Sequence, residues 1–309
     1  MTDEILIARE HDRTGLRAAV KAGSLERVRR GAYRPTTSAA TWADRRELAL
    51  DRIRAVHAQL RATHVFSHVS AALVWGSPVW EIPVRVHVRQ RYRAGGASAT
   101  DIVRHRPLPA GRVMIDDLPV TTAPETVADC LMSAPPLHGL VIADWSLGKI
   151  CTVEEVCRVV AGRAQHQGHA RAELLLDLAD GGAQSAWETW LRYLALRVGL
   201  PRPQTQCPVE TADGTFHTDL GWPEHGVLVE FDGRVKYTDG AFGPAYDAER
   251  ALFDEKTRED AIMAATGARV ARFTARGAKD PARVSRRLLS LFPPQVRAAA
   301  RVNPRLPLP

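Results

Sequence analysis

The sequence predicts an α+β protein, a mixed α/β fold that is divided into more than one domain. The chain has 309 residues, which is long for a single hydrophobic core. Hydrophobic residues make up 45% of it and charged residues 25%, as in ordinary globular proteins. Helical and strand periodicities alternate along the chain, and its last third reads helix, three strands, helix, strand, helix. These three observations favour a protein of helices packed against sheets.

Residues 1–40 predict a winged-helix-like segment. The stretch RTGLRAAVKAG predicts a short helix that Thr14 caps and Gly23 ends. Leu25 to Tyr33 predicts a small hairpin in a basic stretch, and its candidate phosphate contacts are Arg27, Arg29, Arg30 and Arg34. In a winged helix, the helix and the hairpin contact the DNA backbone without reading its sequence. The same residues fit equally well a small α/β cap with a solvated arginine face.

Residues 41–162 predict a mixed α/β domain. Its first helix has the apolar spacing of an amphipathic helix, and later stretches alternate as strands. The expected helices begin near residues 42, 67, 124, 139 and 153, and the expected strands lie in VRVHV, DIVRHRPL and VMIDDLPVTT. In the stretch SHVS, His68 and Ser70 suggest a catalytic dyad, but helix capping is the favoured interpretation.

Three further segments complete the predicted organisation. Residues 163–182 predict a linker, because glycines at 168, 181 and 182 interrupt them. Residues 183–292 predict a second α/β domain, whose first helix Gly199 closes. Its strands are QCPVE, TFHTDLGW, VLVEF and ARVARFT, with a long helix before the last strand and a closing helix after it. Residues 293–309 are expected to form a tail.

Charge and cysteine content narrow the function classes. The net charge of +7 and the pI of about 9.6 favour a polyanionic partner such as a nucleic acid, although arginine-rich composition also follows genome base bias. The four cysteines show no CxxC pair, which argues against a disulfide framework and against a zinc site. The first residues lack the apolar core of a signal peptide, and no apolar run approaches the roughly 18–20 residues of a membrane span. A cytoplasmic protein is therefore expected.

Two carboxylates stand at the end of the strand VLVEF, where a buried strand would carry apolar side chains. These are Glu230 and Asp232, which share a face of the strand. Asp219 lies on the preceding strand and can approach Glu230 across the sheet. Paired carboxylates on adjacent strands suit Mg²⁺ or Mn²⁺, and such an ion assists phosphodiester hydrolysis.

Three other side chains occupy positions where alanine or leucine would be the ordinary choice. Lys256 shares an apolar helical stripe, Lys236 follows the Asp-Gly turn, and Glu188 flanks the buried face of the first helix. A lysine near the phosphate or the attacking water favours the reaction. The alternative is structural: the Asp-Gly pair is a turn, and Glu230 is a salt-bridge partner of Lys256.

The stretch from Ala183 to Leu289 resembles the very-short-patch-repair-like domain of unknown function, within the PD-(D/E)XK nuclease superfamily. SAWETWLRYLALRVGLPRPQTQCPV, FHTDLGWPEHGVLVEFDGRVKY, DEKTRED and GARVARFT carry the resemblance. It implies a restriction-endonuclease-like αβββαβ core, with Asp219 and Glu230 as metal ligands and Glu188 as the assisting helix carboxylate. The lysine position of the pattern holds Asp232, a third candidate ligand. Lys256, with Lys236 in reserve, is the expected replacement for that lysine.

Residues 10–160 resemble the AbiEi family of antitoxin and transcriptional-regulator proteins. LRAAVKAGSLERVRRGAYRP, FSHVSAALVWGSPVW, VRVHVR and DDLPVTTAPETVADCL carry this resemblance. It implies a winged helix before a mixed α/β domain, DNA as a partner, and a cognate toxin protein as a second partner.

Together these features favour a DNA-binding, Mg²⁺-dependent or Mn²⁺-dependent endonuclease-like protein. The competing hypothesis is a non-catalytic DNA-binding regulator or antitoxin that keeps the nuclease fold as a scaffold. The charge alone also allows an RNA partner, but no RNA-specific motif is visible.

Overall fold

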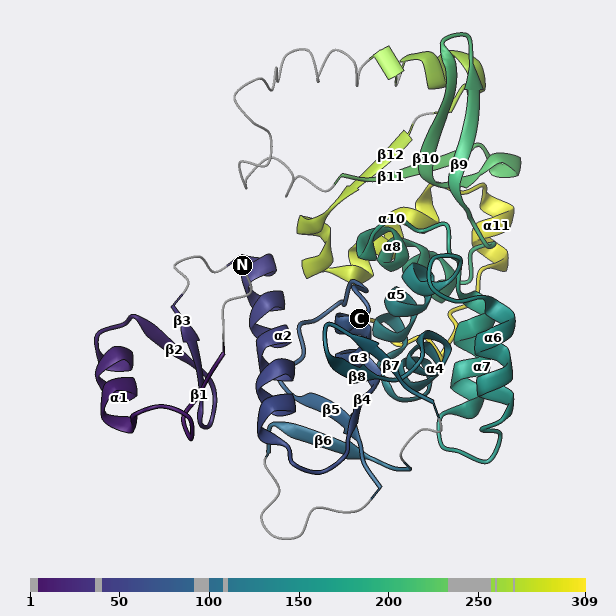
Figure 1. Cartoon of the computed structure of the whole chain (residues 1–309). Helices are drawn as coiled ribbons and strands as arrows, with labels where there is room; N and C mark the ends of the chain where they lie inside the picture. Colours follow the sequence, from purple (N-terminus) through teal and green to yellow (C-terminus); the bar gives the residue numbers. More distant parts are fainter. Residues whose placement is uncertain are drawn as a thin grey trace. The chain divides into compact units, whose positions relative to one another are not determined.

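The computed structural model shows an α+β protein, which confirms the predicted fold class (Figure 1). It describes residues 5–36, 41–91, 100–107, 111–232, 257–258, 260–268 and 270–309. The chain divides into two compact units. The first comprises Met1–Ala134 and Ile150–Ala172, and the second comprises Pro135–Lys149 and Glu173–Pro309. Among the described residues, no helix combines the length and apolar character that crossing a membrane requires.

The first unit begins with a small three-stranded antiparallel sheet of order β1-β3-β2. The predicted hairpin is confirmed by the pairing of β2 with β3. The predicted cap is wrong: Asp12, not Thr14, accepts hydrogen bonds from the first free backbone amides of α1. Thr14 already lies inside the first helical turn, where its own amide needs an acceptor. The elements are β1 (Leu6–Ile7), α1 (Arg13–Lys21), β2 (Leu25–Arg29) and β3 (Ala32–Pro35).

A mixed five-stranded sheet of order β6-β5-β4-β8-β7 forms the rest of the first unit. Helix α3 packs on β5 and against α4, and α4 also packs against α6. Apolar side chains that include Ile53, Phe66, Leu73 and Val88 fill this core and are nearly inaccessible to solvent. The elements are α2 (Trp42–Gln59), β4 (Val65–Phe66), α3 (His68–Val74), β5 (Val86–Arg89), β6 (Ile102–His105), β7 (Val113–Ile115), β8 (Leu118–Val120), α4 (Ala123–Ser133) and α6 (Val153–Ala161).

The second unit is built on a four-stranded sheet of order β12-β11-β10-β9. Strands β9, β10 and β11 run antiparallel, whereas β12 runs parallel to β11. A parallel neighbour needs a long crossover, and the helical residues 260–266 lie in it. The elements are α5 (Pro136–Ser146), α8 (Ala186–Arg197), β9 (Gln204–Thr211), β10 (Gly214–Trp222), β11 (Val227–Asp232), β12 (Val270–Thr274), α10 (Pro281–Ser290) and α11 (Pro294–Ala299).

Some predicted segments differ from the structure. The segment expected as a linker, 163–182, holds the helix α7 (His169–Leu178), because its glycines flank the helix instead of interrupting it. The expected helix near residue 139 is α5, which packs on α8 and so belongs with the second unit. The expected tail holds α11, and its later residues pack on the end of α8. There Gly199 has φ 83, and a Cβ on it would collide with the backbone of Arg301.

Candidate functional site

Three of the predicted carboxylates lie on three elements of the second unit. Glu188 lies in the first turn of α8, Asp219 on β10 and Glu230 on β11. The β10–β11 ladder pairs Leu220 with Val229, so one further step in the same register sets Asp219 opposite Glu230. An Asp219 carboxylate oxygen accepts a hydrogen bond from the backbone amide of Phe231 at 2.7 Å. The two strands therefore hold Asp219 and Glu230 as neighbours.

Electrostatics join Glu188 to this pair. Burial raises the pKa of Glu188, and the charge of Asp219 raises it further. Hydrogen bonds from Gln184, Ser185 and Gln206 act in the opposite direction. Burial also raises the pKa of Glu230, where the charge of Asp219 acts in the same direction and Arg258 and Arg272 oppose it. The charge of Asp219 thus acts on both glutamates, and we call Glu188, Asp219 and Glu230 the acidic cluster.

Glu188 also has a structural role at the start of α8. Its carboxylate accepts hydrogen bonds from the Gln184 amide at 2.8 Å, the Ser185 hydroxyl at 2.8 Å and the Gln206 side chain at 3.1 Å. Ser185 in turn caps the helix by accepting from the Glu188 amide at 3.2 Å. Gln206 has a backbone φ of 46, which side-chain-bearing residues adopt at a cost. The helix cap thus fixes the carboxylate beside β9.

Two arginines neutralise Glu230. Arg258 forms an ion pair with one carboxylate oxygen and also donates to the backbone oxygen of His217 at 2.6 Å. Arg272 approaches the other oxygen at 3.8 Å from β12, where the register pairs it with Glu230. Sequence reasoning missed both cations. Arg258 stands two residues after Lys256, and nothing in the sequence shows which of the two reaches the strand.

The remaining predicted residues of this centre are placed only in part. Asp232 is half-buried at the end of β11 and pairs with Thr274 in the ladder. Lys236 and Lys256 lie outside the described residues. The structure therefore leaves both lysine assignments as predictions.

Aromatic packing fixes α8 against the strand that carries Glu230. The Phe231 ring stacks on the Trp187 ring, with centroids 4.9 Å apart and planes 7° apart. It also meets Trp190 edge to face at 6.3 Å. Because Glu188 follows Trp187 directly, this stack sets the position of Glu188 relative to β11.

The four predicted phosphate-contacting arginines fall into two pairs. Arg34 is buried, and its guanidinium is bound by Glu26 and Asp51 at 2.5 Å and 2.9 Å. Arg29 pairs with Asp101 at 2.8 Å. The other two, Arg27 and Arg30, have exposed side chains. Only the second pair has the exposure that a phosphate contact needs.

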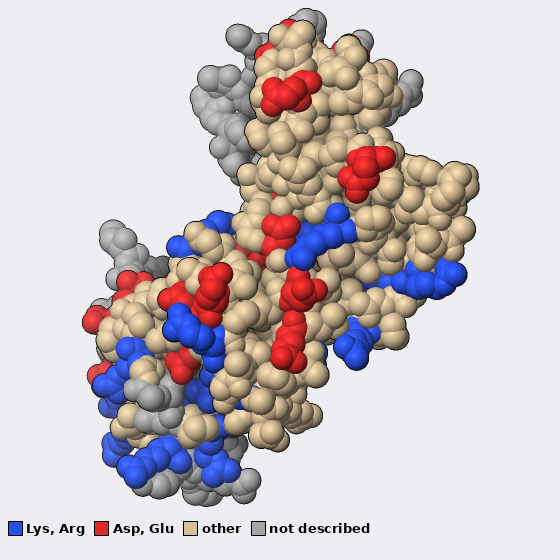
Figure 2. All heavy atoms as spheres, turned by 90° about the vertical axis from the view of Figure 1, so that its right-hand side faces the viewer, with Lys and Arg blue, Asp and Glu red and all other residues tan. Residues whose placement is uncertain are grey.

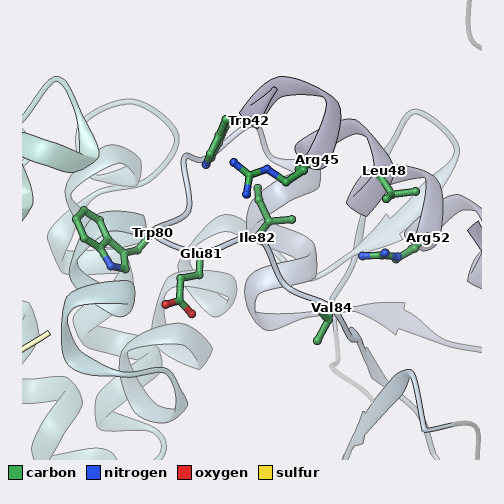
Figure 3. A pocket seen from close by; sticks show the side chains of 8 residues that line it. All are labelled: Trp42, Arg45, Leu48, Arg52, Trp80, Glu81, Ile82 and Val84. Atoms are coloured by element: carbon green, nitrogen blue, oxygen red, sulfur yellow. The ribbon is translucent and has the colours of Figure 1, made fainter. Parts of the chain in front are cut away.

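The structure also contains an open pocket of about 540 Å³ in the first unit. Side chains of α2 line one side of it and the segment 80–84 lines the other, as Figure 3 shows. The lining residues are Trp42, Arg45, Leu48, Arg52, Trp80, Glu81, Ile82 and Val84. Sequence reasoning named none of them as a site.

On the face drawn in Figure 2, basic side chains lie beside acidic ones, so the charge alone marks no single binding surface there.

No family model matches the chain. Two relatives from Mycobacterium tuberculosis are similar to it, "Uncharacterized protein MT2308" of strain CDC 1551 / Oshkosh and "Uncharacterized protein Rv2248" of strain ATCC 25618 / H37Rv. Each is 32% identical over 83 residues, which is 26% of this chain. The matched region covers 31% of each relative, and neither name states an activity.

Proposed function

We propose that this protein binds DNA and hydrolyses phosphodiester bonds with the help of Mg²⁺ or Mn²⁺ held by Asp219 and Glu230. The observation that carries the proposal is the register of β10 with β11, which sets Asp219 opposite Glu230, where the charge of Asp219 raises the pKa of Glu230 and also that of Glu188. A protein that gathers like charges in a half-buried place loses stability unless a cation balances them. Such clusters are more frequent at functional sites than elsewhere.

The order of elements supports the same proposal. Helix α8, strands β9, β10 and β11, the helical residues 260–266 and strand β12 follow one another as in the αβββαβ core that the nuclease resemblance implies. The predicted ligands stand on the second and third strands of that core, and the assisting carboxylate stands on its first helix. Because a fold alone does not prove an activity, the carboxylates carry the proposal.

We infer a hard divalent cation from the chemistry of the donor atoms. Asp219 and Glu230 offer carboxylate oxygens from adjacent strands, and oxygen donors are the ligands that Mg²⁺ and Mn²⁺ prefer. When bound, such an ion stabilises developing charge on a phosphate and acidifies a bound water. Glu188, fixed by the cap of α8, would orient a water or a second ligand beside the pair.

Arg258 is one of the two arginines that contact Glu230. A guanidinium keeps its charge and binds phosphate oxygens in two-pronged fashion, so Arg258 can turn from Glu230 to a DNA phosphate. It joins Lys256 and Lys236 as a candidate for the role of the missing motif lysine. The exposed Arg27 and Arg30 would contact the DNA backbone.

A second candidate function has its own observation. Arg258 and Arg272 already balance Glu230, and Asp232 stands where the nuclease pattern has its lysine. A site whose acid is neutralised by arginines needs no metal. In that case the protein is a DNA-binding regulator or antitoxin, and the acidic cluster only holds the sheet together.

Two assays distinguish the nuclease from the regulator: calorimetric titration with Mn²⁺ and Mg²⁺, and then nicking of supercoiled plasmid DNA. We expect metal binding and nicking by the wild type, and loss of both in Asp219→Ala and Glu230→Ala with the fold intact by circular dichroism. The matched control is Glu224→Ala, which removes an exposed carboxylate from the connection between the same two strands. Arg258→Met should keep metal binding and lose nicking if Arg258 contacts phosphate.

Each outcome bears on one of the two functions. A wild type that binds neither ion, with or without a DNA duplex, refutes the nuclease proposal. DNA binding without metal binding or nicking supports the regulator. Metal binding that Glu224→Ala abolishes as fully as Asp219→Ala would show that the effect is one of net charge.

A further inference from the structure

Three histidines of the first unit lie together although they come from three separate elements. His68 begins α3, His87 lies on β5 and His105 ends β6. Strands β5 and β6 run parallel, and the register pairs Arg89 with His105. Alternation along β5 puts His87 on the same face as Arg89, so His87 and His105 project from one face of the sheet. Helix α3 packs on β5 and brings His68 to them.

The distances suit ligands of one ion. Nε2 of His105 lies 3.1 Å from Nδ1 of His87. Two nitrogens bound to one tetrahedral Zn²⁺ at about 2.0–2.1 Å are separated by roughly 3.3 Å. One nitrogen from each of the three rings lies within 4.8 Å of the other two. The His68 ring stacks on the His105 ring with centroids 3.7 Å apart, so it must turn toward the pair when an ion binds.

A fixed carboxylate stands behind His68. Nδ1 of His68 lies 3.5 Å from an oxygen of Asp129 and 2.9 Å from the hydroxyl of Ser67, so Nε2 of His68 is left to bind an ion. Asp129 is buried and is itself held by Arg89 at 2.6 Å and Arg163 at 2.7 Å. A hydrogen bond to its second nitrogen orients a metal-bound imidazole; here the Ser67 hydroxyl makes that bond, and the Asp129 carboxylate lies next to the same nitrogen.

The backbone at His68 gives a second, independent indication. His68 has a φ of 54 while its residue is only 6% exposed. Residues held in this region of backbone space are concentrated at active sites and ligand sites. A cluster that served packing alone would need neither this backbone nor three imidazoles, because leucine fills such space without polar nitrogens.

We propose that His68, His87 and His105 bind one divalent transition-metal ion that prefers imidazole ligands, such as Zn²⁺. Asp129 is a positioning residue for His68. Three histidines leave a fourth ligand position for water or an anion, and the half-buried His87 and His105 give solvent access to it. Nitrogen donors distinguish this site from the carboxylates of the second unit, which suit harder ions.

The test is calorimetric titration of the full-length chain with Zn²⁺. We expect one ion per chain, with affinity at least about 100-fold lower in both His87→Ala and His105→Ala. The matched control is His57→Ala, because the ring nitrogens of His57 and His64 also lie 3.0 Å apart but belong to no group of three ligand residues in the described part of the chain. Asp219→Ala should bind Zn²⁺ as the wild type does.

A second measurement does not depend on variants that fold. Long-range ¹H–¹⁵N spectra of the wild type should show the imidazole nitrogens of His68, His87 and His105 shifting together as Zn²⁺ is added. Absence of Zn²⁺ binding by the wild type overturns the proposal. So does binding that persists in both His87→Ala and His105→Ala, binding that only His57→Ala abolishes, or a titration in which these three rings stay unshifted.

Discussion

Replacement of Asp144 by alanine is expected to destabilise the second unit, because this buried carboxylate ties α5 to the helix that carries Glu188. Asp144 is 1% exposed and accepts hydrogen bonds from Arg192 at 2.6 Å and from the Thr189 hydroxyl at 2.8 Å. It also accepts from the backbone amide of Asp180 at 2.9 Å. Arg192 is 0% exposed, so the substitution leaves a guanidinium without its counter-ion away from water.

The magnitude follows from these contacts. Breaking a buried ion pair by removal of one partner costs about 3–5 kcal/mol. Each neutral donor left without an acceptor costs about 1–3 kcal/mol more, and local relaxation lowers the sum. We therefore expect Asp144→Ala to lose about 5 kcal/mol, which is comparable to the whole stability of a marginal domain. In the double variant Asp144→Ala, Arg192→Met no unpaired charge remains, so about 3 kcal/mol of that loss should be recovered.

Urea unfolding followed by far-UV circular dichroism measures the loss, and amide hydrogen exchange resolved by mass spectrometry locates it in α5 and α8. The matched control is Asp213→Ala, which removes an exposed carboxylate at the turn between β9 and β10 and should change stability by less than about 0.5 kcal/mol. The reasoning is refuted if Asp144→Ala costs less than about 1 kcal/mol, or if the double variant is no more stable than the single one.

Two further substitutions test the electrostatics of the two units. In Asp219→Asn we expect the pKa of Glu188 and of Glu230 to fall toward ordinary values, because the charge of Asp219 raises both in the wild type. Titration of the glutamate carboxyls by ¹³C NMR measures these pKa values, and values that stay unchanged contradict the electrostatic coupling of the acidic cluster. Because the pKa of both glutamates is raised in the folded wild type, folding favours their protonated form. Their contribution to stability is therefore fully present below the unfolded pKa of about 4.3, and it is lost as the pH rises through the raised pKa of the folded state. In the first unit, Asp51→Ala removes the carboxylate that Arg34 contacts at 2.9 Å but leaves Glu26 as a partner of Arg34. We expect the free energy of unfolding, measured in urea, to fall by about 2 kcal/mol, and a fall of more than about 4 kcal/mol would show that Glu26 does not compensate.

The candidate site was partly predictable from local pattern. Alternation along VLVEF and its neighbour places Glu230 and Asp219 on adjacent strands, and the register of β10 with β11 confirms that neighbourhood. The cap of α8 was not foreseen, although Ser185 followed three residues later by Glu188 is the pattern of a capping box. Such local signals lie within a few residues of one another, and backbone geometry alone connects them.

The sequence by itself determined the α+β class, the order of elements in the last third of the chain and the acidic character of one strand end, because these depend on side-chain periodicity and turn chemistry over short distances. Only the tertiary structure decided that Arg258 reaches Glu230, that Arg34 is buried instead of facing a phosphate, and that His68, His87 and His105 meet. Each of these contacts joins residues that are well separated along the chain. Their distances are set by strand register and helix packing, which no local pattern in the sequence encodes.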